Sequence, residues 1–140
     1  MKLLEDSAHA SECDTFRLRM AESRQLSDFG VVSLMLIHQP TLRDALVTTM
    51  KYRHLLNELL AIHVEERGRT VVIREEFVPD AGTPSRQAVE LALGALHRLC
   101  AALLGSHWKQ HAVAFTHAAP DNPQIHRRVF RCALEFDREF

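Results

Sequence analysis

The spacing of the apolar residues changes near residue 60, and this change limits the chain to folds that combine helices with strands. Before it, the apolar residues from Leu42 to about Leu60 recur at the 3.6-residue spacing of an amphipathic helix. After it, two runs on either side of Arg67-Gly68-Arg69 alternate between apolar and polar residues. Two alternating runs around a glycine turn predict an antiparallel hairpin, which Pro79-Asp80-Ala81-Gly82 closes.

Capping residues mark where the predicted helices begin and end. A short helix is predicted from Asp14 to Glu22, and Thr41 with Asp44 forms an acidic variant of a capping box before the helix that starts at Leu42. Thr83-Pro84 opens a second long helix, which Gly105 ends. The apolar stripe expected along this helix comprises Val89, Leu93, Leu96, Cys100 and Leu103.

The remaining apolar segments complete the fold prediction. The run from Phe29 to Ile37 favours a helix, although a buried strand has the same composition. Alternation from Ala112 to His117 predicts a third strand and alternation around Leu134 a fourth, with a short helix from Gln124 to Phe130 between them. The predicted fold class is α+β, a mainly antiparallel sheet of about four strands with several helices packed on it. We expect one domain over residues 1–140, since a chain of this length can bury one core.

Charge and cysteine content exclude several classes of protein. The 17 basic and 18 acidic residues give a net charge of −1, which argues against a chain that binds nucleic acid by itself. Cys13, Cys100 and Cys132 are an odd number of cysteines and lie far apart, so they predict neither a disulfide framework nor a thiolate zinc site. The longest apolar stretch, Val31 to Ile37, is too short to cross a membrane. We therefore expect a soluble cytoplasmic protein without a membrane partner.

Two histidines are the only candidates for a metal site. His107 and His111 stand four residues apart, a spacing that lets two imidazoles share a metal on one helical turn. The pair follows the terminating Gly105, however, and a third ligand has no obvious place. A solvated loop is therefore the favoured interpretation, and no metal or other cofactor is predicted.

His117 is the first polar candidate for a binding pocket. By alternation it shares the inward face of the third strand with Phe115, where it can bind a small molecule or hold the following turn. The structural role is the favoured one. Cys100 and His97 are neighbours on one helix, but Cys100 belongs to the apolar stripe and no third residue completes a nucleophilic site, so no enzyme is predicted. Glu75 shares a face of the hairpin with apolar residues and its partial burial is left open.

Several segments, taken in order, resemble one family. The pattern is similar to the N-terminal arabinose-binding-like regulatory domain of AraC/XylS-type transcription regulators, and it covers the chain from about Leu3 to Phe136. Arg17 stands where this family usually has glycine, and Lys109-Gln110 replaces a connection that usually carries proline. The matching segments are Phe29-Gly30, Gln39-Pro40-Thr41-Leu42-Arg43-Asp44-Ala45-Leu46, Lys51-Tyr52-Arg53, Arg86-Gln87-Ala88-Val89-Glu90, Trp108, Val113-Ala114-Phe115-Thr116-His117-Ala118-Ala119-Pro120, Phe130 and Leu134-Glu135-Phe136.

The resemblance implies a bacterial domain that senses a small-molecule effector and forms a homodimer. DNA would be contacted only through a C-terminal helix-turn-helix domain, and since the chain stops at Phe140 we expect it to be truncated. With the pocket against the sheet, the polar contacts expected with the effector are His117, Tyr52 and Arg74, with His97 next. Two alternatives remain open: a dimerisation module without a ligand, and a small metal-dependent enzyme.

Overall fold

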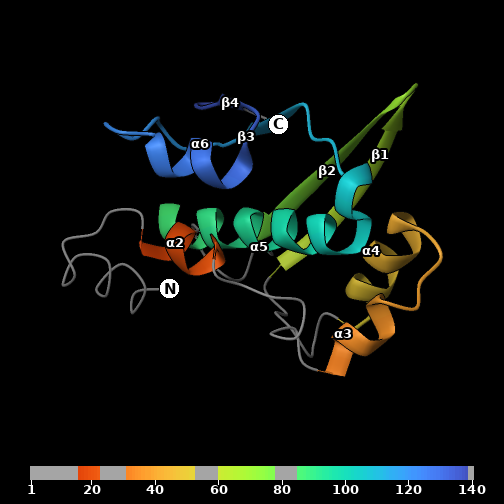
Figure 1. Ribbon diagram of the computed structural model, residues 1–140. Coiled ribbons are helices and arrows are strands. Elements are labelled where there is room, and N and C mark those ends of the chain that lie inside the picture. The colour runs from red at the N-terminus through yellow and green to blue at the C-terminus, as the bar shows by residue number, and fades with distance from the viewer. Residues whose placement is uncertain (1–15, 23–30, 53–59, 78–84, 139–140) are drawn as a thin grey trace. The chain divides into compact units, whose positions relative to one another are not determined.

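The computed structural model describes residues 16–22, 31–52, 60–77 and 85–138 (Figure 1). The chain divides into two compact units. Residues 25–84 form the first, which we name the hairpin unit. Residues 1–24 and 85–140 form the second, which we name the α5 unit after its longest helix. The expectation of a single domain over the whole chain stays a prediction.

The hairpin unit contains two short helices followed by two strands. They are α3 (Val31–Leu36), α4 (Leu42–Lys51), β1 (Leu60–Arg67) and β2 (Thr70–Phe77). α3 confirms that the apolar run favours a helix over a strand. Thr41 caps α4 as predicted, because its hydroxyl accepts a hydrogen bond of 3.1 Å from the backbone N–H of Asp44.

The predicted helix from Leu42 to about Leu60 is too long at its C-terminal end. α4 ends at Lys51, Tyr52 is its C-cap residue, and Leu60 is the first residue of β1. Residues 53–59 lie outside the described part of the chain. The apolar spacing that predicted one long helix therefore extends from a helix into a strand. Leucines three or four residues apart also occur by chance across such a boundary.

β1 and β2 form the antiparallel hairpin that the alternation predicts. The register runs from Leu60 opposite Phe77 to Arg67 opposite Thr70, which leaves Gly68 and Arg69 as the turn. Gly68 has a φ of +64°, a left-handed conformation that glycine adopts without steric cost.

The α5 unit is built around one long helix. Its elements are α2 (Phe16–Glu22), α5 (Arg86–Leu104), the 3₁₀ helix η4 (Gly105–His107), β3 (Ala112–Ala114), α6 (Gln124–Phe130) and β4 (Ala133–Glu135). Gly105 ends α5 and α6 has the predicted bounds. The predicted N-cap is wrong: Ser85, not Thr83, caps α5, with its hydroxyl accepting from the N–H of Ala88 at 3.1 Å.

Helix α2 packs closely against α5, and Gly94 makes this possible. A Cβ atom at Gly94 would lie 2.5 Å from the Cβ of Ala21 and 3.3 Å from a methyl group of Leu18. Leu18 is fully buried with Phe115, Val129 and Phe130 in the core of this unit. Figure 1 shows α2 and α6 alongside α5.

The prediction of one mainly antiparallel sheet is wrong. Among the described residues, β1 and β2 form one two-stranded sheet, and β3 and β4 form another, in which the strands are parallel. Helix α6 lies between β3 and β4 in the chain, and a strand–helix–strand connection returns the second strand in the same direction as the first. The α+β class holds.

α5 is also the one described helix that is long and apolar enough to cross a membrane. The segment Arg86–His107 meets the requirement by length and composition alone, and it is longer than the stretch from Val31 to Ile37 that the sequence singles out. Core helices of soluble proteins have the same length and composition, and α5 packs against α2 and α6.

Candidate functional site

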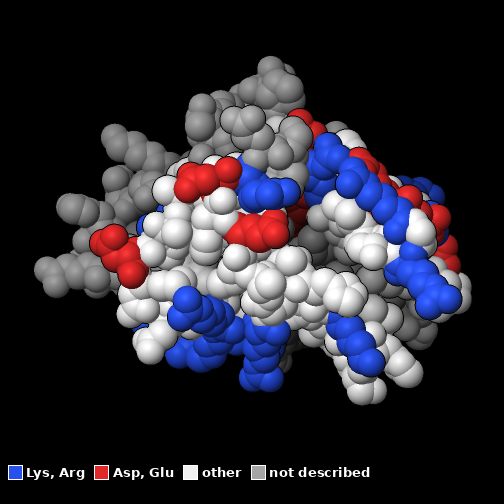
Figure 2. Space-filling view, turned by 90° about the horizontal axis from the view of Figure 1, so that it is seen from above, with Lys and Arg blue, Asp and Glu red and all other residues white. Residues whose placement is uncertain are grey.

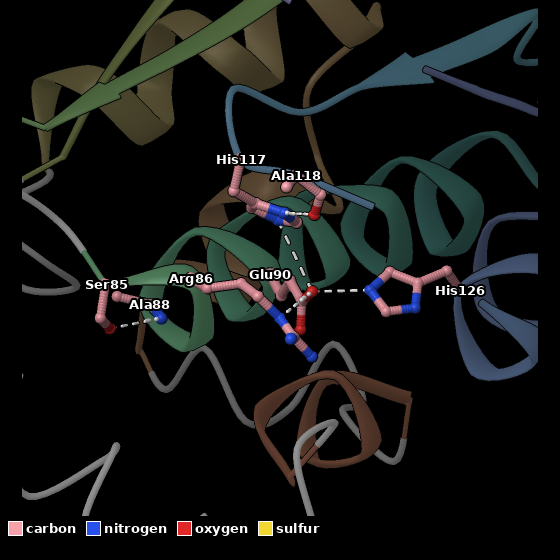
Figure 3. A network of polar contacts seen from close by, with 7 residues as sticks. All are labelled: Ser85, Arg86, Ala88, Glu90, His117, Ala118 and His126. Atoms are coloured by element: carbon pink, nitrogen blue, oxygen red, sulfur yellow. Dashed lines mark hydrogen bonds and ion pairs between the residues drawn. The ribbon is translucent and has the colours of Figure 1, made fainter. Parts of the chain in front are cut away.

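A buried carboxylate, Glu90, lies at the centre of a polar cluster in the α5 unit (Figure 3). Its Oε1 accepts a hydrogen bond of 2.6 Å from Nε2 of His126 and one of 3.0 Å from Nε of Arg86. Nε2 of His117 lies 3.6 Å from the same oxygen. The side chains of Glu90 and His126 are fully buried, and that of His117 is 15% exposed. We name these four residues the Glu90 cluster.

Three elements bring the Glu90 cluster together. Arg86 and Glu90 are one turn apart on α5, which the Ser85 cap fixes at its start. His126 comes from α6. His117 comes from the segment after β3, where pairing with the segment after β4 continues through a hydrogen bond of 2.9 Å from the N–H of Asp137 to the carbonyl of His117. The cluster therefore joins α5, α6 and the segment after β3.

Hydrogen bonds assign the proton on each imidazole. Nδ1 of His117 lies 2.9 Å from the carbonyl oxygen of Ala118, which can only accept, so Nδ1 donates. Nε2 of His126 donates to Glu90 in the same way. Three buried atoms of the cluster are left without a hydrogen-bond partner: Oε2 of Glu90, Nε2 of His117 and Nδ1 of His126.

Aromatic rings surround the two imidazoles. Phe115 stacks on Phe136 with 5.1 Å between the ring centroids and 11° between the planes. The ring of His117 lies 5.0 Å from that of Phe115, and the ring of His126 lies 5.9 Å from it and edge-on. These rings keep water from one side of the cluster, so that its hydrogen bonds and charges act in a medium of low polarity.

His97, another predicted contact, lies in the same unit but outside the cluster. Its Nδ1 accepts a hydrogen bond of 3.4 Å from the indole N–H of Trp108, and its ring is 5.6 Å from that of Phe130. Burial lowers the pKa of His97, and the positive charges of Arg98 and Arg131 lower it further. Phe130 in turn contacts Phe115, so a continuous row of rings connects His97 to His117.

The other two predicted contacts, Tyr52 and Arg74, belong to the hairpin unit. Tyr52 donates its backbone N–H to Thr48 at 3.1 Å, and the ammonium of Lys51 lies 5.6 Å from its ring. Arg74 on β2 forms an ion pair with Glu65 on β1, and Arg67 bonds the same carboxylate. Their role in binding a ligand stays a prediction.

His107 and His111 do not share a turn of α-helix. His107 ends the 3₁₀ helix η4, no helix covers the residues from 108 to 111, and both side chains are exposed. Within the described ranges, no group of three or more His, Cys, Asp or Glu residues is arranged to hold a metal ion. Both signs of charge are present on the face shown in Figure 2, in keeping with the nearly balanced charge of the sequence.

Comparison with known proteins identifies the family. The family model described as the arabinose-binding domain of AraC transcription regulators, N-terminal part, matches residues 1–140. The chain belongs to this family. The resemblance seen in the sequence is thereby confirmed, and with it the assignment to a regulatory domain of transcription regulators.

Curated relatives of this AraC-type domain are transcription regulators themselves. The HTH-type transcriptional regulator VirS of Mycobacterium tuberculosis, in strains CDC 1551 / Oshkosh and ATCC 25618 / H37Rv, is 25% identical over 140 residues. The match covers 99% of this chain but 41% of each relative. The chain thus spans less than half the length of the regulators it resembles.

Of the Glu90 cluster, the sequence predicted His117 as a site residue but not Arg86, Glu90 or His126. Arg86 and Glu90 belong to a segment that resembles the family pattern, and His126 belongs to a short basic run, His126-Arg127-Arg128, that is typical of a solvated face. One signal was available: Gln87, Glu90 and Gly94 recur at helical spacing, and all three are buried on α5. A carboxylate within such a stripe needs basic partners, and Arg86 one turn away is the first of them.

Proposed function

We propose that this AraC-type domain senses a small-molecule effector in the bacterial cytoplasm and thereby controls DNA binding by a helix-turn-helix segment of the same regulator. The match of the family model to residues 1–140 carries this proposal, and the similarity to an HTH-type regulator supports it. The chain contributes binding and no chemistry.

The Glu90 cluster is where an effector would act. It connects α5, α6 and the segment after β3. Oε2 of Glu90, Nε2 of His117 and Nδ1 of His126 are buried there without a hydrogen-bond partner. A ligand that binds one arrangement of these elements better than another shifts the population toward that arrangement. The shift is limited by the difference between the two affinities, so an effector must contact groups that move.

The test is a thermal-unfolding screen of the chain with amino acids, amines, sugars and short fatty acids. An effector that binds the folded state raises Tm in proportion to the logarithm of its concentration. A compound that raises Tm is then added to the full regulator, and DNA binding is measured by fluorescence anisotropy. Failure of every compound class to raise Tm contradicts the effector function.

Dimerisation is a second candidate function, and exposed apolar residues on the hairpin unit favour it. Leu34 on α3, Ile37 in the turn after it and Val47 on α4 are 62%, 50% and 62% exposed, and such apolar side chains gain free energy when a partner surface covers them. Sedimentation equilibrium of the chain and of Val47→Lys tests it. We expect a dimer that the substitution dissociates, and a wild-type monomer at all concentrations contradicts it.

A further inference from the structure

The unpartnered atoms of the Glu90 cluster define what kind of ligand fits there. Oε2 of Glu90 and Nε2 of His117 are buried and have no hydrogen-bond partner. Buried polar atoms in native proteins are nearly always paired, so each exception requires an explanation. A bound molecule supplies one.

Both atoms are hydrogen-bond acceptors. His117 donates its Nδ1–H to Ala118, so in the neutral ring its Nε2 carries a lone pair. A carboxylate oxygen only accepts, and Arg86 and His126 both bond Oε1, which leaves the lone pairs of Oε2 unused. A ligand that satisfies the two atoms must therefore bring donors.

The two acceptors lie within reach of one donor group. Nε2 of His117 is 3.6 Å from Oε1 of Glu90, beyond hydrogen-bond length, and Oε2 is bonded to the same carbon as Oε1. The N–H bonds of an ammonium diverge by about 109°, so two hydrogen bonds of about 2.9 Å from one nitrogen bridge acceptors about 4.7 Å apart. Nδ1 of His126 points away from Glu90 and takes no part (Figure 3).

We propose that Oε2 of Glu90 and Nε2 of His117 bind the ammonium group of a small primary amine with an apolar carbon skeleton. An ammonium has three donors, and its hydrogen bond to a carboxylate is assisted by charge. The stacked rings of Phe115 and Phe136 beside His117 suit methylene groups and a nearby cation. An anionic ligand would instead meet the charge of Glu90. This inference rests on the proposed effector function and gives the effector its chemical class.

Butylammonium chloride, 1-butanol and sodium butyrate are the matched probes. They share a four-carbon chain and differ in the group that would meet Glu90. Each is added to the 140-residue chain at the same concentration and ionic strength, and Tm is measured. We expect butylammonium to raise Tm by about 4 °C at ten times its Kd, and the alcohol and the acid to leave Tm unchanged.

Three variants locate the binding. Glu90→Gln removes the charge at nearly constant shape, and His117→Phe removes the open nitrogen but keeps a ring against Phe115. Both are expected to lose the Tm shift caused by butylammonium. Glu135→Gln removes an exposed carboxylate of the same unit and should keep the shift. If Glu90→Gln does not fold, His117→Phe decides. Long-range nitrogen NMR of the wild-type chain should show Nε2 of His117 shifting on addition of butylammonium.

The outcomes separate this inference from the function on which it rests. Equal shifts by butylammonium and 1-butanol, or a shift that survives in His117→Phe, overturn the amine site. Stabilisation by sugars or fatty acids with none by amines overturns the amine site but keeps the effector function. A screen without any stabilising compound overturns both.

Discussion

The two units each contain a carboxyl group with a buried oxygen, and their surroundings differ. Glu90 in the α5 unit has Arg86, His117 and His126 around it. Glu75 on β2 of the hairpin unit is half-buried as a residue, but its Oε2 is buried without a partner, and burial raises the pKa of Glu75 to about 8. The comparison shows that a fold either brings basic groups to a buried carboxylate or leaves it to take up a proton.

Removal of Glu90 should give the largest effect. Glu90→Ala removes the acceptor of the buried N–H of His126 and the acceptor of one hydrogen bond from Arg86, whose side chain is 29% exposed. Loss of one partner from a buried ionic cluster costs about 3–5 kcal/mol. Urea unfolding measures this loss of unfolding free energy. The control is Glu135→Ala, which removes an exposed carboxylate and should change the unfolding free energy by no more than about 0.5 kcal/mol. An equal effect of the two substitutions would mean that the cluster contributes nothing to stability.

Neutralisation of Glu75 should act in the opposite direction. Its pKa is about 8 in the folded chain against 4.5 as the ordinary value, so between these pH values the folded state holds a proton that the unfolded state has lost. Stability therefore falls as pH rises through this window. Glu75→Gln should be more stable than the wild type by roughly 2–4 kcal/mol at pH 8 and equal to it near pH 4. Parallel pH profiles of the two proteins would contradict this.

One glycine in each unit resists substitution, for a different physical reason in each case. Gly94→Ala should cost about 1–3 kcal/mol, because the new Cβ meets Ala21 at 2.5 Å and α2 must move. Gly68→Ala meets no atom within 4 Å and should cost about 1–2 kcal/mol through its φ of +64° alone. Asparagine tolerates this conformation, so Gly68→Asn should recover part of the stability, while Gly94→Asn should not. Urea unfolding of the four variants distinguishes the two causes.

The exposed ion pair between Glu22 on α2 and Arg128 on α6 should give the smallest effect. Both nitrogen–oxygen contacts are 2.6 Å, and the hydrogen bond from Arg128 lowers the pKa of Glu22. The pair therefore stabilises above pH 4.5 and loses its effect as pH falls through the lowered pKa. Glu22→Gln should lower Tm slightly at low salt and not at about 1 M NaCl. A loss that persists at high salt would show that Glu22 acts through packing.

Local sequence signals predicted the helices and strands, whereas contacts between distant segments determine how the strands pair and where some helices end. The Thr41 cap, the turn at Gly68 and the end of α5 at Gly105 depend on residues a few positions apart, so the sequence identifies them. The parallel pairing of β3 with β4 follows from the helix between them, a rule that the prediction of an antiparallel sheet did not apply. The end of α4 at Lys51 has no comparable breaker in the sequence before it.

The candidate site was harder to predict than the fold for the same reason. His117 was found because strand alternation places it beside Phe115. His126 lies 36 residues from Glu90, and helix α6 shows no local sign that one of its polar side chains faces a carboxylate. His126 and Glu90 meet because α6 packs on α5, and this packing cannot be deduced from the residues around either position in the sequence.

The order of the segments in the α5 unit has a consequence for how the chain folds during its synthesis. Helix α2 is synthesised before the whole hairpin unit, yet its packing partner α5 begins at Arg86, after that unit. Residues 25–84 form a loop that must be made and closed before Leu18 and Ala21 can meet Gly94. Ribosomes add about 5–20 residues per second, so several seconds pass between the synthesis of α2 and that of α5. During this time the apolar side chains that α2 later buries against α5 lack their packing partner. The hairpin unit, whose contacts are local, has time to fold first.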